Sequence, residues 1–135
     1  MFDKILCVDD DPITLMLYKK VLTIANFSKE IDSANNGKQA LTYFDNLKSE
    51  IVSNSNTVFP KIVFLDLNMP ILSGWEFLDI FTQNGYSSVF PDTKVIVMSS
   101  TIDPKDIEKS KSYPMVIEFL SKPITKEMLR TLQLS

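Results

Sequence analysis

Short apolar runs alternate along the chain with longer segments in which apolar residues recur at the period of a helix. Runs of strand length occupy residues 4–8, 31–34, 62–65, 94–98 and 116–120. Several of these runs are apolar throughout, which is typical of strands covered on both faces. Five strands that alternate with five helices predict an α/β fold, a doubly wound five-stranded parallel sheet.

The segments between the strands carry helix signals. Asp11 and Asp103 each precede a proline, and Thr125 precedes the last segment, so all three are predicted N-caps. The helices are expected at about residues 12–25, after the turn at residues 35–37, and at about 74–84, 104–112 and 125–135. Residues 48–60 are polar and are predicted to be a long surface loop or a helix extension. The inner face of the first helix is predicted to carry Ile13, Leu17, Val21 and Ile24.

Composition narrows the class of protein. A length of 135 residues suits one domain spanning residues 1–135. The absence of histidine excludes Ser-His-Asp and Cys-His catalysis and His-ligated zinc. A net charge of -3 with one arginine argues against nucleic-acid binding. No apolar stretch is long enough for a membrane span or a signal peptide. The lone Cys7 is predicted to be a buried structural thiol, and the protein is predicted to be cytoplasmic.

Polar side chains collect where the predicted strands end. Asp9 and Asp10 follow the first strand, Asp66 the third, Ser99 the fourth and Lys122 the fifth. The carboxyl ends of parallel strands share one edge of the sheet, so these side chains should meet there. Three converging carboxylates repel one another unless a cation lies among them, and oxygen ligands suit Mg²⁺. Because Asp is a known nucleophile in phosphoryl chemistry, this edge is a predicted magnesium-dependent phosphoryl-accepting site.

Four segments that contain these polar residues together resemble the motifs of a known family. They are residues 5–12, residues 64–70 followed by Ser73-Gly74, residues 97–100 and residues 119–123. In this order the chain resembles the receiver domain of two-component response regulators, and is similar over its whole length to the stand-alone chemotaxis-type regulators. The resemblance implies the flavodoxin-like strand order 2-1-3-4-5.

The family implies a role for each residue that matches its motifs. Asp66 is the expected phospho-acceptor, attacking the phosphohistidine of a sensor histidine kinase or a histidine phosphotransfer protein. Asp10, Asp66 and the backbone carbonyl of Asn68 are the expected Mg²⁺ ligands, and Asp9 acts through a metal-bound water. Lys122 pairs with the phosphoryl group. Such a protein is a signalling phospho-acceptor, and the only reactions it catalyses are its own phosphorylation and dephosphorylation.

The resemblance also implies a switch. Ser99 is expected to move toward the phosphoryl group while Phe119, where many relatives carry Tyr, turns inward. Asn68 and Ser100 are expected to flank the phosphoryl group and tune its hydrolysis, and the bond between Lys122 and Pro123 is expected to be cis. Output is expected through an unknown downstream protein docking on the face made by the last two helices and the fifth strand.

Three alternatives share parts of this pattern. A haloacid-dehalogenase-type phosphatase needs a second Asp two residues after its nucleophile, where this chain has Asn68. A flavodoxin-like flavin binder needs a loop of Ser, Thr and Gly after the first strand, where residues 9–12 hold three aspartates and a proline. The third alternative is a receiver that has lost phosphorylation and remains as a binding scaffold.

Overall fold

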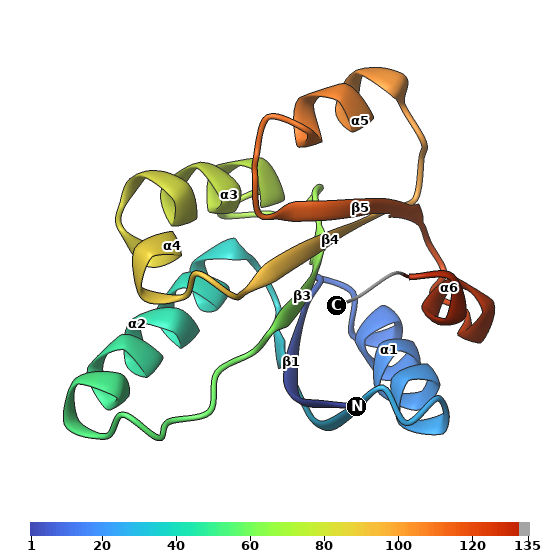
Figure 1. The fold of residues 1–135 in the computed structure, drawn as a ribbon. Coiled ribbons are helices and arrows are strands. Elements are labelled where there is room, and N and C mark those ends of the chain that lie inside the picture. Colours follow the sequence, from blue (N-terminus) through green and yellow to red (C-terminus); the bar gives the residue numbers. More distant parts are fainter. Residues whose placement is uncertain (133–135) are drawn as a thin grey trace.

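The computed structural model describes residues 1–132, which contain one five-stranded sheet (Figure 1). The strands are β1 (Phe2–Val8), β2 (Ser28–Ala34), β3 (Ile62–Asp66), β4 (Lys94–Ser99) and β5 (Val116–Ser121). All neighbouring pairs are parallel and the order is β2-β1-β3-β4-β5. The fold class and the strand order predicted from the sequence and the resemblance are therefore confirmed.

Helices cover both faces of the sheet, and there are six in the described residues rather than five. They are α1 (Pro12–Ile24), α2 (Gly37–Ser53), α3 (Gly74–Gln83), α4 (Tyr86–Val89), α5 (Pro104–Ser110) and α6 (Lys126–Thr131). In Figure 1, α1 and α6 lie on one side of the sheet and α2, α3 and α4 on the other. None of the helices in residues 1–132 combines the length and the apolar character needed to cross a membrane.

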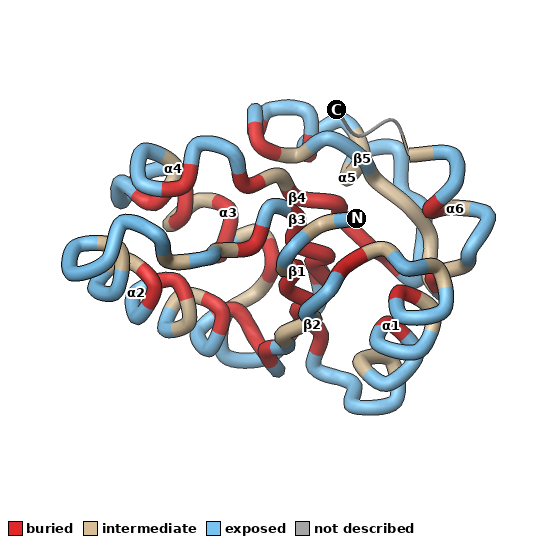
Figure 2. Tube along the Cα trace, turned by 60° about the horizontal axis from the view of Figure 1, so that its bottom comes forward, coloured by how far each residue is buried: buried red, intermediate tan, exposed pale blue. Residues whose placement is uncertain are grey.

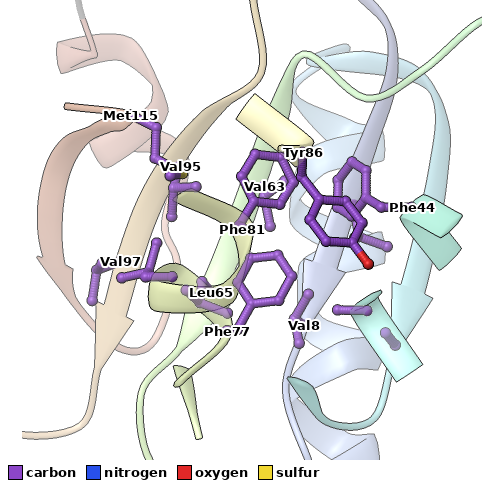
Figure 3. Packing of buried hydrophobic residues seen from close by; sticks show 14 of the residues in the cluster. Val8, Phe44, Val63, Leu65, Phe77, Phe81, Tyr86, Val95, Val97 and Met115 are labelled. Atoms are coloured by element: carbon purple, nitrogen blue, oxygen red, sulfur yellow. The ribbon is translucent and has the colours of Figure 1, made fainter. Parts of the chain in front are cut away.

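The core has one apolar layer on each face of the sheet. On one face, Phe44 of α2 packs edge-on against Phe81 of α3 and against Phe90, with ring centroids 5.1 Å apart in both pairs. Figure 3 shows the rings of Phe81 and Phe77 beside the strand residues Val63 and Leu65, with Phe44 in the same cluster. Figure 2 shows buried residues along the strands and exposed residues on the outer sides of the helices. The helices thus cover both faces of the central strands, and the exposed strand residues lie toward the edges and ends of the sheet.

The predicted inner face of α1 is wrong for three of its four residues, and only Val21 is half-buried and packs against the core. Its buried residues are Tyr18 and Leu22, whereas Ile13 and Ile24 are 74% and 55% exposed. Leu17, also predicted to lie inside, is exposed as well. Apolar residues lie on almost every side of this helix, so their spacing is compatible with more than one stripe. The contact with the sheet selects the stripe through Tyr18, whose ring lies 5.6 Å from that of Phe64.

The helix that the sequence pattern missed, α4, is a single four-residue turn. Gly85 precedes it with φ of 84°, a left-handed conformation that glycine adopts without strain and that separates α4 from α3. The polar residues 48–60 are both a helix extension, as far as Ser53, and a loop. At the C-terminus α6 ends at Thr131, and the predicted helical residues 133–135 lie outside the described residues.

Candidate functional site

The predicted polar residues do meet at the carboxyl edge of the sheet. Asp66 and Ser99 are the last residues of β3 and β4, Asp9 directly follows β1, and Lys122 directly follows β5. The parallel register aligns Asp66 with Met98 and Ser99 with Ser121, so the strand ends are level. The Lys122 backbone N–H donates to the Ser99 carbonyl at 2.8 Å, which fixes the start of the loop after β5.

Lys122 joins the two buried carboxylates of the site. Its Nζ atom lies 2.8 Å from Asp9 Oδ2 and 3.2 Å from Asp66 Oδ1. Asp9 is completely buried, Asp66 is 4% exposed, and the lysine side chain is mostly covered. In so little solvent, each charge is strongly affected by its neighbours.

The charges at this edge are unbalanced. Burial raises the pKa of Asp66, and the adjacent charge of Asp9 raises it further, against the lowering effect of Lys122. For Lys122, burial alone lowers the pKa, but the two carboxylates outweigh burial and raise it. Lys122 therefore stays protonated, yet one ammonium group does not fully offset the nearby carboxylates. A further cation would favour the ionised form of Asp66.

The third carboxylate, Asp10, completes a group that could hold such a cation. One oxygen atom from each of Asp9, Asp10 and Asp66 lies within 4.8 Å of the others. Asp10 is exposed, so the group opens to solvent on one side. Carboxylate oxygens without nitrogen or sulfur ligands match the donor set that Mg²⁺ prefers. The residues present therefore fit a hard divalent cation.

Asp11 is the N-cap of α1 and lies outside this group. Its carboxylate accepts from the Ile13 N–H at 2.9 Å and from the Thr14 hydroxyl at 3.1 Å. Its own backbone N–H donates to Asp9 Oδ1 at 3.0 Å and so orients the buried carboxylate. Cys7, the last apolar residue but one of β1, is a buried free thiol whose pKa is raised by burial. Both residues have the structural roles that their sequence context predicts.

The hydroxyl of Ser99 is directed to its own loop. It donates to the Thr101 carbonyl at 2.7 Å and accepts from the Thr101 N–H at 3.3 Å. Ser100 beside it is exposed. Asn68, also exposed, donates its backbone N–H to Asp66 Oδ1 at 3.4 Å. The role of Thr101 was missed, because nothing in the Ser-Ser-Thr run of the sequence shows which hydroxyl pairs with which backbone group.

The backbone at the start of α3 packs closely against the backbone of Asp66. A Cβ atom on Gly74 would lie 2.4 Å from the Asp66 carbonyl oxygen, so only glycine fits there. The Gly74 N–H donates to the Leu67 carbonyl at 3.0 Å. This contact holds the first turn of α3 against the backbone of Asp66. The Lys122–Pro123 peptide bond, on the opposite side of the site, is cis.

Phe119 lies farther from the carboxylates, on β5. Its side chain is half-buried and lines a cavity of about 170 Å³ between β5 and α5. The other lining residues include Ile107, Ser110 and Val116. The cavity offers space beside the ring, which is the geometric requirement for a change of rotamer.

Comparison with known proteins agrees with this architecture. The family model for the response regulator receiver domain matches residues 5–133. The chain belongs to the receiver domain family. A solved two-component response regulator from Cytophaga hutchinsonii is 30% identical to this receiver, with a TM-score of 0.81 over 96% of this chain and 92% of that chain.

Two curated relatives are larger proteins. The two-component response regulator ARR7 of Arabidopsis thaliana is 30% identical over 121 residues, which cover 89% of this receiver and 55% of ARR7. A protein-glutamate methylesterase/protein-glutamine glutaminase of Methanococcoides burtonii is 28% identical over 123 residues, covering 89% of the receiver and 30% of that protein. The receiver thus spans less than two thirds of the length of either relative. As a response regulator receiver domain, it is a signalling domain of two-component systems.

Proposed function

We propose that this receiver accepts a phosphoryl group on Asp66 in a Mg²⁺-dependent reaction. The donor is the phosphohistidine of a sensor histidine kinase or a histidine phosphotransfer protein. The observation that carries the proposal is the buried Asp66 carboxylate, 3.2 Å from Lys122 Nζ and grouped with two further aspartates. In a receiver domain, that arrangement supports Asp66 as the nucleophile. Lys122, and a cation held by the aspartates, would bind the phosphoryl oxygens.

The transfer requires Asp66 in its ionised form. A carboxylate oxygen of Asp66 forms a bond to phosphorus while the bond from phosphorus to the donor histidine nitrogen breaks, and its electron pair returns to the imidazole. Lys122 is held in place by Asp9 and stays protonated, so it is available to the phosphoryl oxygens. Asp10, Asp66 and the Asn68 carbonyl would hold Mg²⁺ directly and Asp9 would act through a metal-bound water. The ion would neutralise charge on the transferring group.

We infer that Ser99 changes partner after the transfer. Its hydroxyl leaves the Thr101 carbonyl and donates to a phosphoryl oxygen, which displaces the loop between β4 and α5. Phe119 then turns into the cavity beside it. Because Phe119 has no hydroxyl, packing alone drives this rotation. The exposed side chains of Asn68 and Ser100 flank the phosphoryl group and regulate the approach of the hydrolytic water.

The exposed apolar side of α1 is the proposed docking surface for the phosphodonor. Ile13 and Met16 are both more than 70% exposed and lie in the first turns of α1, close in sequence to Asp10. A large donor must cover this region to reach Asp66, and exposed apolar side chains commonly mark protein contacts. A downstream protein would dock on the face of α5, β5 and α6. We place this exchange in the cytoplasm, a compartment that suits the buried free thiol of Cys7.

The test is the intact mass of the protein after incubation with Mg²⁺ and acetyl phosphate. We expect one phosphoryl adduct on the wild-type protein, none on Asp66→Asn, and none when magnesium is chelated. Asp103→Asn, which alters an exposed helix cap of α5, is a matched control and should form the adduct. If the wild-type protein forms no adduct and binds no beryllofluoride, the scaffold alternative replaces this proposal.

A further inference from the structure

Four side chains join the end of α5 to the first two turns of α3. The ring of Trp75 stacks on that of Tyr113, with centroids 6.0 Å apart and planes inclined by 28°. The Nζ atom of Lys109, in the last turn of α5, lies 4.3 Å from the centroid of the Trp75 ring. The Tyr113 hydroxyl donates to Asp79 Oδ1 at 2.5 Å. We refer to Trp75, Asp79, Lys109 and Tyr113 as the α3–α5 clamp.

Most residues of α5 are exposed. Among its seven residues, Ser110 is the only one that is buried. A half-open pocket of about 170 Å³ is lined by Ile107 and Ser110 on the α5 side and by Phe119 on β5, so the groove between this helix and the edge strand is not completely filled. Figure 1 shows α5 beside β5, at the edge of the sheet opposite α2. The clamp is therefore one attachment of this helix and of the segment after it to the described part of the domain, beside the contacts between α5 and β5.

Both ends of α5 are connected to the site. The loop before it contains Thr101, which is hydrogen-bonded to Ser99 at the end of β4. The clamp at its other end includes Trp75, and the neighbouring Gly74 lies against the Asp66 carbonyl. If Ser99 changes partner as proposed above, the first end of α5 moves with the loop, while the clamp contacts act at the second end.

We propose that the α3–α5 clamp is a regulatory contact that holds α5 in its unphosphorylated position and thereby weakens the response of the domain to a phosphoryl group on Asp66. The inference rests on the proposed function of Asp66. A ligand that binds more tightly when α5 is displaced must supply the free energy that stabilises α5 in its original position. Weakening the clamp therefore increases the affinity of the site for a phosphoryl mimic, although no clamp residue touches the mimic.

The charge and exposure of the clamp residues show which contacts can be removed one at a time by substitution. Lys109 is exposed, so its cation contributes through the face of Trp75 and not through packing in the core. Burial and the hydrogen bond to Asp79 raise the pKa of Tyr113 to about 12, so its hydroxyl remains a donor at neutral pH. Lys109→Gln removes the cation, and Tyr113→Phe removes the hydrogen bond but keeps the ring.

The experiment is a titration with beryllofluoride in excess Mg²⁺, followed by ¹⁹F NMR and by the emission of Trp75, the only tryptophan of the chain. Lys105→Gln is the matched control, because it removes the same charge from the exposed first turn of α5. We expect Lys109→Gln to bind beryllofluoride about two- to fivefold more tightly than the wild type, the range that corresponds to one exposed cation–π contact. Tyr113→Phe should bind more tightly by at least as much, because it removes a hydrogen bond to a carboxylate. Lys105→Gln should bind with wild-type affinity, and Trp75 emission should change on binding in the wild type.

Unchanged or weaker binding by both clamp variants, with normal binding by the wild type, would overturn the regulatory role of the clamp while leaving the proposed function intact. An equal increase in Lys105→Gln would also overturn it, because the effect would then be one of net charge. Failure of the wild type to bind beryllofluoride in the ¹⁹F spectrum would instead contradict the proposed function itself. Thermal unfolding of each variant identifies any that has lost the fold, and in that case the remaining clamp variant decides.

Discussion

At the scale of single residues, the ionisation of Asp66 depends on how much of the nearby negative charge Lys122 can offset. Lys122 contacts both Asp9 and Asp66, yet burial and the charge of Asp9 still raise the pKa of Asp66. The ionised carboxylate that the proposed phosphoryl transfer needs is thus disfavoured in the absence of a further cation. Accumulated negative charge lowers the stability of the cation-free protein and at the same time favours binding of a cation.

Asp66→Asn is therefore predicted to stabilise the protein in the absence of Mg²⁺, on the order of 1 kcal/mol at pH 7. A raised folded pKa means that the folded state binds more protons than the unfolded state at and above the ordinary value of 3.8. Wild-type stability consequently falls as pH rises through this window, and the Asn variant lacks that fall. Urea denaturation of both proteins at several pH values measures the difference. A variant less stable than the wild type at every pH would contradict it.

Tyr18 offers a second prediction at this scale. Its side chain is 1% exposed, and its hydroxyl has no hydrogen-bond partner within residues 1–132. A buried hydroxyl without a partner costs about 1–3 kcal/mol. Tyr18→Phe, which keeps the ring against Phe64, should raise the free energy of unfolding by about 1 kcal/mol. Tyr43→Phe is the control that should lower it, because the Tyr43 hydroxyl donates to Asp32 at 2.7 Å. A loss of stability in Tyr18→Phe would refute the unpaired hydroxyl.

Sequence reasoning located the residues of the site but not their orientation. Each of Asp9, Asp66, Ser99 and Lys122 follows or ends an apolar run, so a parallel sheet brings them together whatever its details. The bond between Ser99 and Thr101 is different, because it depends on the torsion angles of a loop. Side-chain hydroxyls compete for several nearby backbone groups, and the sequence does not determine which one they choose.

At the scale of secondary-structure elements, α1 shows how tertiary contacts decide what periodicity leaves open. The pattern predicted an inner stripe through Ile13 and Ile24, but these residues face outward and Tyr18 and Leu22 face the sheet. The N-caps were predictable, because Asp11, Asp103 and Thr125 each accept from a backbone N–H of the helix they precede. The N-cap hydrogen bonds are thus encoded locally, whereas the buried face of a helix that is apolar on many sides is not.

The outward apolar residues of α1 lead to a prediction about the donor. Ile13→Ser should slow phosphotransfer from a phosphorylated histidine phosphotransfer protein about tenfold, the effect typical of removing one apolar contact from the centre of an interface. The rate with acetyl phosphate should be unchanged, since a small donor does not cover α1. Val52→Ser, at an 89% exposed position near the end of α2, is the control and should affect neither rate. Equal slowing with both donors would contradict docking on α1.

At the scale of the whole molecule, alternation of strands and helices was sufficient to predict the class of fold. The strand order followed from the resemblance to receivers and not from the hydrophobic period, which is the same for every order of parallel strands. The short helix α4 was missed because four residues are too few to show a period. Its Tyr86 is bonded to Asp45 of α2, a contact between segments 41 residues apart.

Mg²⁺ is predicted to stabilise the whole domain through the acidic group at the sheet edge. At a concentration a hundredfold above its dissociation constant, a ligand specific for the folded state adds about 2.7 kcal/mol to the free energy of unfolding. Thermal unfolding should show a Mg²⁺-dependent rise in Tm for the wild type and a much smaller one for Asp10→Asn. Asp103→Asn should retain the full rise, because its carboxylate caps α5 and lies outside the acidic group. An equal rise in all three proteins would indicate a non-specific salt effect.

The most direct test of the central claim is to locate the phosphoryl bond. Reduction of the phosphorylated protein with borohydride cleaves an aspartyl phosphate and converts that aspartate to homoserine, which peptide mass spectrometry then identifies. After incubation with acetyl phosphate and Mg²⁺, we expect homoserine at position 66 and at no other aspartate. Homoserine at position 9 or 10, or an unreduced Asp66 in protein that carries the phosphoryl group, would contradict the assignment of Asp66 as the acceptor.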